Sequence, residues 1–130
     1  MQPPKNITYH KIGHTLELTW ADDNFVLPAE LLRVYSPSAE VRGHSPDQRK
    51  LQTGKKNVGI RQIEPVGNDA IRIVFDDGHD SGIFAWEFLH DLGTQMDKYW
   101  QDYITELKAA NASRLPNIPV GQWTPPRPAT

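Results

Sequence analysis

The chain has 130 residues, a formal net charge of −2 and no cysteine. This length predicts one domain, and the charge offers no general attraction to nucleic acid or to an anionic membrane. Without cysteine, the chain itself cannot supply a disulfide, a thiolate nucleophile, or a cysteine-ligated zinc or iron–sulfur site. No apolar run reaches the roughly 18 residues that a membrane span needs, and the N-terminus lacks a secretory signal, so we expect a cytoplasmic protein.

The first part of the chain predicts a strand–turn–strand–helix unit after an N-terminal tail over residues 1–5. Short polar residues over 21–24 predict a turn, because their side chains bond the backbone and tolerate left-handed conformations. Pro28 suits the first turn of a helix over 29–35. Three strands are predicted from alternating or short apolar runs, over residues 7–10, 15–20 and 25–27.

Residues 36–57 contain little apolar content and predict a long irregular loop, which is either functional or mobile. Beyond this loop, apolar and polar residues alternate again, and a helical pattern follows. A short helix is predicted over 85–92, with Gly93 ending it. Three strands are predicted before that helix, over residues 58–65, 70–75 and 81–84.

The last predicted helix carries an amphipathic stripe from Met96 to Leu107, which indicates a face packed on the core. Thr94 and Asp97 resemble a capping box at its start. From residue 112 onward the chain is rich in proline, and we predict a disordered tail over 112–130. The folded domain is therefore expected over residues 6–111.

An internal duplication is visible in this pattern. Leu16–Trp20, followed by two aspartates, parallels Ile71–Phe75, which is also followed by two aspartates. The second turn is two residues longer, and the added residues fall around Gly78–Asp80. The sequence thus predicts an α+β fold: a mostly antiparallel sheet from two strand–turn–strand–helix units, a C-terminal amphipathic helix and the disordered tail.

His79 is the first candidate site residue, because it lies in the lengthened turn among Asp76, Asp77 and Asp80. Nearby carboxylates are expected to favour the protonated imidazole. His79 could also ligate iron or zinc together with Asp80, or with His44 from the long loop. A turn histidine that bonds a carboxylate and fixes the loop is the simpler interpretation. Adjacent residues on an extended chain point to opposite faces, so residues 79–81 do not form a catalytic triad.

The long loop supplies the second candidate, a basic patch with a net charge of +4 across residues 42–57. Arginine in such a patch offers bidentate bonds to a carboxylate or a phosphate. A solvated charge run is the alternative interpretation. No aromatic residue lies between these charges, so binding to RNA is not expected.

Three segments together resemble a known family: residues 27–44, the strand over 58–61 and residues 75–86. The chain is similar over about residues 6–110 to the DUF971 family, the gamma-butyrobetaine hydroxylase-like N-terminal domain. Members stand alone in bacteria, or are joined to the hydroxylase or to P-loop iron–sulfur cluster carriers. The resemblance implies a stand-alone bacterial member, for which no activity is established, and no part of the hydroxylase's catalytic domain.

The resemblance also implies where a zinc ion would lie, since the hydroxylase domain holds zinc through three cysteines and one histidine. Those positions correspond here to Ser36, Ser38, about Val41, and His79. Hydroxyls and a valine cannot replace thiolates as zinc ligands, so a Cys3His zinc site is not expected. No other cofactor is expected, although iron or zinc bound in another way stays possible.

Three hypotheses for function follow. The first is a non-catalytic accessory module that docks on a protein partner, with a docking face around Arg33, Arg42, His44 and His79. The second is a metal-binding role, with iron or zinc, linked to iron–sulfur cluster handling. The third is a small enzyme of unknown reaction, for which no complete catalytic set of residues is visible; we expect no catalytic residue.

Overall fold

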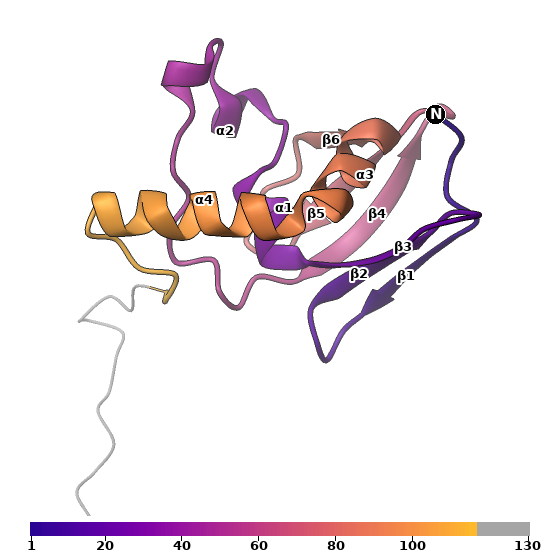
Figure 1. The fold of residues 1–130 in the computed structure, drawn as a ribbon, viewed down its shortest axis with the longest axis horizontal. Helices are drawn as coiled ribbons and strands as arrows, with labels where there is room; N and C mark the ends of the chain where they lie inside the picture. The colour runs from indigo at the N-terminus through magenta and orange to yellow at the C-terminus, as the bar shows by residue number, and fades with distance from the viewer. Residues whose placement is uncertain (117–130) are drawn as a thin grey trace, which may run out of the picture.

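The computed structural model describes residues 1–116, which form two antiparallel three-stranded sheets and four α-helices (Figure 1). The α+β class predicted from the sequence is confirmed. The predicted single sheet is divided in two, because no hydrogen-bonded strand pair joins the first three strands to the last three within residues 1–116.

The first sheet has the order β1-β2-β3 and runs into a short helix. Leu16 pairs with Leu27 across the middle of this sheet, so both side chains point to the same, buried face. Helix α1 continues directly from Pro28, whose extended backbone serves as its N-cap. The elements of this unit are β1 (Asn6–His10), β2 (Thr15–Thr19), β3 (Asn24–Pro28) and α1 (Ala29–Val34).

The second sheet has the order β4-β5-β6 and repeats the arrangement of the first unit. Each unit ends with a strand, a turn, a second strand and a helix, which confirms the duplication seen in the sequence. Leu16, Leu18, Ile73 and Phe84 belong to one buried cluster, so the two sheets share a single core. The elements are β4 (Ile60–Val66), β5 (Ala70–Phe75), β6 (Gly82–Ala85) and α3 (Trp86–Thr94).

Gly93 does not end α3, as the sequence predicted, but lies inside that helix. A side chain at this position would overlap the ring of Phe25 on β3, so glycine permits close packing of α3 on the first sheet. The predicted capping box is also absent, because the Thr94 hydroxyl donates to the Asp91 carbonyl oxygen at 3.2 Å. Gln95 makes no side-chain bond at the start of α4 (Met96–Ala109).

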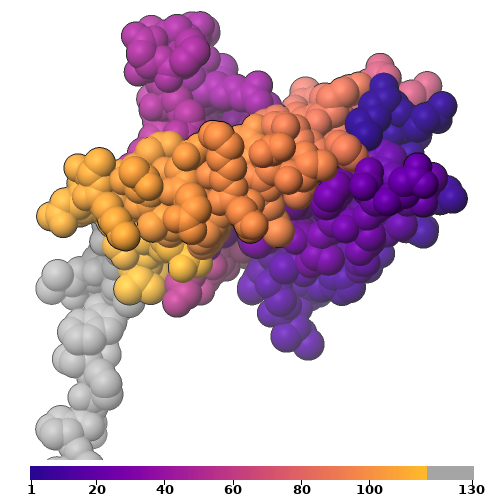
Figure 2. Space-filling model, viewed as in Figure 1, coloured from indigo at the N-terminus to yellow at the C-terminus, as the bar shows by residue number. Residues whose placement is uncertain are grey.

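The long loop contains two short helices, α2 (Ala39–Arg42) and a 3-10 turn over Pro46–Gln48. Ser38 caps α2, since its hydroxyl accepts a hydrogen bond from the Glu40 amide at 3.2 Å. Figure 2 shows this segment standing out from the body of the molecule beside α4. The first part of the stretch predicted as irregular thus holds two short helices, whereas residues 49–57 form no helix or strand.

The ordered fold also extends past the boundary expected at residue 111. Arg114 forms an ion pair with the buried carboxylate of Glu30 at 2.7 Å. The backbone amides of Gly54 and Lys56 donate to the carbonyl oxygens of Ser113 and Arg114, both at 3.0 Å. Residues 112–116 thus belong to the fold, and the rest of the predicted tail, 117–130, lies outside the described residues.

Candidate functional site

His79 is turned into the protein by the β5–β6 turn and is only 7% exposed. The Phe75 amide donates to the His79 carbonyl oxygen at 2.9 Å, while the His79 amide donates to the Asp77 carboxylate at 3.1 Å. Gly78 adopts a φ of 94° between them, a conformation that glycine accepts without strain. The lengthened turn therefore serves to direct the imidazole inward.

Both ring nitrogens of His79 have partners on the segment that carries α2. Nε2 lies 2.8 Å from the hydroxyl of Ser36, and Nδ1 lies 3.3 Å from the carboxylate of Glu40. The Ser36 hydroxyl also accepts a weak bond from the Ser38 amide at 3.3 Å. The network is satisfied if neutral His79 donates from Nδ1 to Glu40 and accepts from Ser36 at Nε2.

The expectation that the surrounding aspartates would favour protonated His79 is wrong. Burial lowers the pKa of His79, and the positive charge of Arg33 lowers it further. The carboxylates of Glu40 and Asp77 act in the opposite direction but do not reverse the shift. The aspartates are neighbours of His79 along the chain, but the folded turn places the imidazole away from solvent.

An ion cluster lies beside His79. Asp77 Oδ2 accepts hydrogen bonds from Arg33 Nε at 2.8 Å and from Lys55 Nζ at 2.6 Å. Burial opposes ionisation of Asp77, but the bonds from Lys55, the His79 amide and Arg33 outweigh it and hold the pKa at about 2. Asp77 thereby connects Arg33 to the turn that holds His79.

A groove lies between α2 and the helices α3 and α4. It has a volume of about 280 Å³; Arg42 and Arg49 line it, and Ser36 is buried at its wall. An adjoining hollow of about 270 Å³ shares both arginines and reaches His44. We call these two connected hollows the arginine groove. The remaining side chains of the first hollow are aromatic and acidic: Tyr35, Phe88, Tyr99, Asp102 and Glu106. Gly43, Ser45 and Pro46 complete the second hollow.

The guanidinium groups of the two arginines lie over aromatic rings. The guanidinium carbon of Arg42 lies 4.8 Å from the ring centre of Phe88, and that of Arg49 lies 4.6 Å from the ring centre of Tyr35. Arg49 Nη1 also donates to Glu106 at 2.6 Å. A cation–π contact of this kind helps to hold a guanidinium in place.

Comparison with known proteins shows the family of the chain. The model of the family described as gamma-butyrobetaine hydroxylase-like, N-terminal, matches residues 7–90. The chain belongs to this family. A search of curated proteins gives no match.

Three solved structures are similar to this family member. Two were determined by NMR in solution: one is 50% identical with a TM-score of 0.78, covering 92% of this chain and 95% of its own. The other is 44% identical with a TM-score of 0.77, covering 91% and 89%. The third, a DUF971 protein of unknown function from Acidithiobacillus ferrooxidans, is 36% identical with a TM-score of 0.59, covering 69% and 91%.

The positions that the family resemblance implies for zinc do converge here, although their donors do not suit the metal. Ser36 bonds His79, and Ser38 bonds Ser81 at 2.7 Å between the hydroxyl oxygens. A zinc site needs thiolates or several imidazoles, whereas this cluster offers one imidazole with both nitrogens engaged. The buried Val41 side chain adds no donor. The residues present do not fit zinc, and hydrogen bonds connect the same positions instead.

The other two proposed metal ligands, Asp80 and His44, make their contacts with residues other than His79. Asp80 is exposed and faces Arg72, with 3.7 Å between Asp80 Oδ2 and the guanidinium. His44 is exposed and lines the arginine groove. Within residues 1–116, no group of three or more His, Asp or Glu side chains is arranged to hold a metal ion.

Ser36, His79 and Glu40 follow the order of a nucleophile, base and carboxylate. Sequence reasoning missed this set because its members are far apart along the chain. The Ser36 side chain has no exposed surface, and Gly82 lies so close that a side chain there would overlap the Ser36 hydroxyl. An acyl group has no path to this oxygen, so the arrangement gives no support to acyl transfer.

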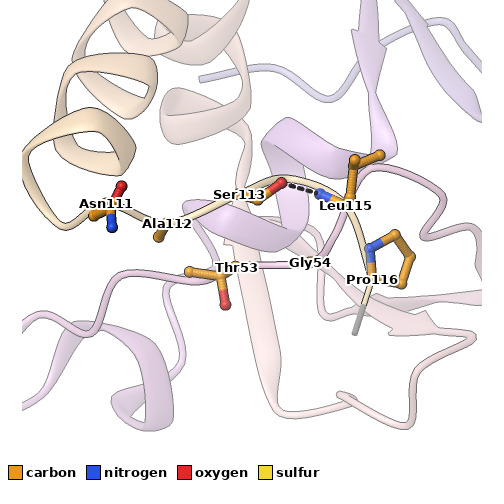
Figure 3. A pocket seen from close by; sticks show the side chains of 7 residues that line it. All are labelled: Thr53, Gly54, Asn111, Ala112, Ser113, Leu115 and Pro116. Carbon is orange, nitrogen blue, oxygen red and sulfur yellow. Dashed lines mark hydrogen bonds between the residues drawn. The ribbon is translucent and has the colours of Figure 1, made fainter. Parts of the chain in front are cut away.

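A larger hollow of about 530 Å³ lies between Gly54 and residues 111–116 (Figure 3). Its lining side chains are small, amide or aliphatic, and the Ser113 hydroxyl is used internally to accept from the Leu115 amide at 3.0 Å. Among residues 1–116, no charged group lines it. The arginine groove is therefore the better candidate site.

None of the helices over residues 1–116 combines the length and apolar character that crossing a membrane requires.

The sequence-predicted docking residues fall into two pairs. Arg42 and His44 are exposed and line the arginine groove. Arg33 and His79 are buried and meet through Asp77, so they offer almost no surface of their own. Phe88 was missed by sequence reasoning; its spacing from Arg42 carries no local signal.

Proposed function

We propose that this chain is a non-catalytic binding module that docks a protein partner through the arginine groove. The observation that carries the proposal is Arg42, an exposed guanidinium stacked on Phe88 that forms no ion pair within residues 1–116. Arginine and aromatic residues are enriched where binding energy concentrates in protein interfaces. A positioned cation beside an aromatic floor supports recognition of another protein.

The buried network supports the same role by fixing one wall of the groove. Ser36 is buried at the wall of the groove and bonds His79. The Glu40 carboxylate, two residues before Arg42 on α2, lies 3.3 Å from His79 Nδ1. A four-residue helix has no stability of its own and depends on such contacts. Arg42 is thus presented from a wall whose position is set before any partner arrives, which reduces the ordering cost of binding.

Photo-crosslinking from the rim of the groove tests the proposal. A photoreactive phenylalanine analogue replaces exposed His44 in the full chain, and cross-linked proteins are isolated from the native cell extract. The matched control carries the same analogue at Arg61, an exposed residue on β4. We expect a defined partner to cross-link from position 44, and expect Arg42→Glu to abolish the product while Arg61→Glu leaves it unchanged.

Two outcomes would reject docking at this groove. One is the same set of products from positions 44 and 61, which would indicate non-specific contact. The other is a specific product from position 44 that Arg42→Glu leaves at full yield.

A further inference from the structure

We infer that the arginine groove binds a peptide segment in which a carboxylate side chain stands beside an aromatic or aliphatic one. This inference rests on the proposed docking function and names the partner's chemistry. It depends on three properties of the groove: hydrogen-bond donors without acceptors, the charge of the adjoining hollow, and the aromatic floor.

The hydrogen-bond donors of the two arginines are incompletely used. Arg49 donates from Nη1 to Glu106, but its Nη2 is buried and has no hydrogen-bond partner among residues 1–116. A buried N–H is usually paired, because loss of its hydration is unfavourable. Arg42 adds a guanidinium edge with no carboxylate partner among the same residues. A carboxylate placed beside Arg42 would accept from that exposed guanidinium, with the charge of Arg49 nearby.

The charges around the groove favour an anion at that position. Its two acidic side chains already have cations: Glu106 pairs with Arg49 at 2.6 Å, and Asp102 pairs with Lys98 at 2.9 Å. The adjoining hollow contains Arg42, Arg49 and His44 but has no acidic lining residue. Arg42, at the boundary shared by the two hollows, is therefore a positive charge that no carboxylate within residues 1–116 offsets by an ion pair.

The floor of the groove suits an apolar neighbour of that carboxylate. Tyr35 and Tyr99 pack edge to face, with ring centres 4.9 Å apart, and the Tyr35 hydroxyl donates to the Tyr99 carbonyl oxygen at 2.7 Å. Phe88 stacks on Phe84 of the core, with ring centres 6.2 Å apart. These rings are held by internal contacts, so they offer a preformed apolar surface next to the arginines.

An NMR titration of the full chain with two capped peptides tests this inference. The probe is acetyl-Asp-Phe-Glu-Leu-amide, and its neutral isostere is acetyl-Asn-Phe-Gln-Leu-amide. We expect the acidic probe to give saturable shifts at the amides of Arg42, Arg49 and Phe88. We expect binding at least about tenfold weaker for the neutral peptide and for Arg42→Gln with the acidic probe, since one charge-assisted bond is worth that factor or more. Arg61→Gln should bind as the native chain does.

Equal binding of the two peptides, or shifts that do not include groove residues, would overturn the inference. So would an absence of saturable shifts with the acidic probe. These outcomes do not decide the cross-linking experiment. If a partner cross-links from position 44 but the acidic probe neither binds nor competes, docking at the groove stands and only the recognition of a carboxylate is rejected.

Discussion

Removal of the Arg114 guanidinium should destabilise the whole domain, although Arg114 lies close to the end of the described chain. Its partner Glu30 is 5% exposed and accepts from Arg114 Nε at 2.8 Å, from Nη2 at 2.7 Å, and from the Tyr103 hydroxyl at 3.1 Å. Arg114→Met keeps much of the side-chain volume but leaves Glu30 with one hydrogen bond and no counter-charge. The substitution therefore isolates the electrostatic part of the contact.

The magnitude follows from the burial of the pair. Breaking a fully buried ion pair costs about 3–5 kcal/mol, because the remaining charge is uncompensated. Arg114 is 34% exposed, so water can partly reach the Glu30 carboxylate once the guanidinium is gone. We therefore expect a loss of about 2–3 kcal/mol in the free energy of unfolding. In urea this is a midpoint lowered by roughly 1 M or more, for an m-value near 2 kcal/mol/M.

Two further variants separate this cause from lost packing of Arg114 on Trp100, whose ring centre lies 4.8 Å from the guanidinium carbon. Glu30→Gln combined with Arg114→Met should be more stable than Arg114→Met alone, since the buried charge is removed. Lys98→Met breaks an exposed ion pair and should give no measurable change. A loss below about 0.5 kcal/mol for Arg114→Met would refute the reasoning.

Three other predictions concern the turn that holds His79. The pKa of His79 in the folded chain lies below its ordinary value of 6.5, so the contribution of His79 to stability is complete above pH 6.5 and is lost as the pH falls below it. In urea unfolding at several pH values, His79→Asn should flatten the dependence of the unfolding free energy on pH; an unchanged dependence would contradict this. Gly82→Ala should destabilise the native chain more than it destabilises Ser36→Ala, because the added methyl overlaps the Ser36 hydroxyl; equal losses would exclude that overlap. The Asp77 carboxyl, with a pKa of about 2, should stabilise the fold above pH 3.8 and lose this effect toward pH 2; NMR titration of its side-chain carbon checks the value, and a midpoint near 3.8 would disprove it.

Local patterns along the chain were sufficient for the strands and for the duplicated unit. Alternation over Ala70–Phe75 predicted β5 with its observed bounds, since Ile71, Ile73 and Phe75 belong to the same core cluster. Gly93 shows where such reasoning failed. A glycine near the end of a helical pattern usually marks a cap, but here the ring of Phe25 on the first sheet requires it within α3. That requirement comes from a contact between distant segments.

For the candidate site too, local sequence pointed to one part, and contacts between distant segments determined the rest. The two-residue lengthening directed attention to the His79 turn, which is a central part of the observed network. Its environment could not be inferred, because Ser36 and Glu40 reach the imidazole from a segment some 40 positions earlier. The three aspartates nearby in sequence suggested a protonated ring, whereas burial and Arg33 decide the shift.

Residues 36, 38 and 79 lie together between the β5–β6 turn and the arginine groove. Their contacts explain how the turn affects the groove, although its own residues are hardly exposed there. In this chain, hydrogen bonds connect positions at which the family resemblance implies metal ligands, so the α2 segment is fixed to the β5–β6 turn without a metal. Hydroxyl and imidazole bonds act on the same wall of the arginine groove because Ser36 belongs to both. Arg42, on the helix that this network secures, can therefore be an exposed cation with a defined position, which is the property that the docking proposal requires.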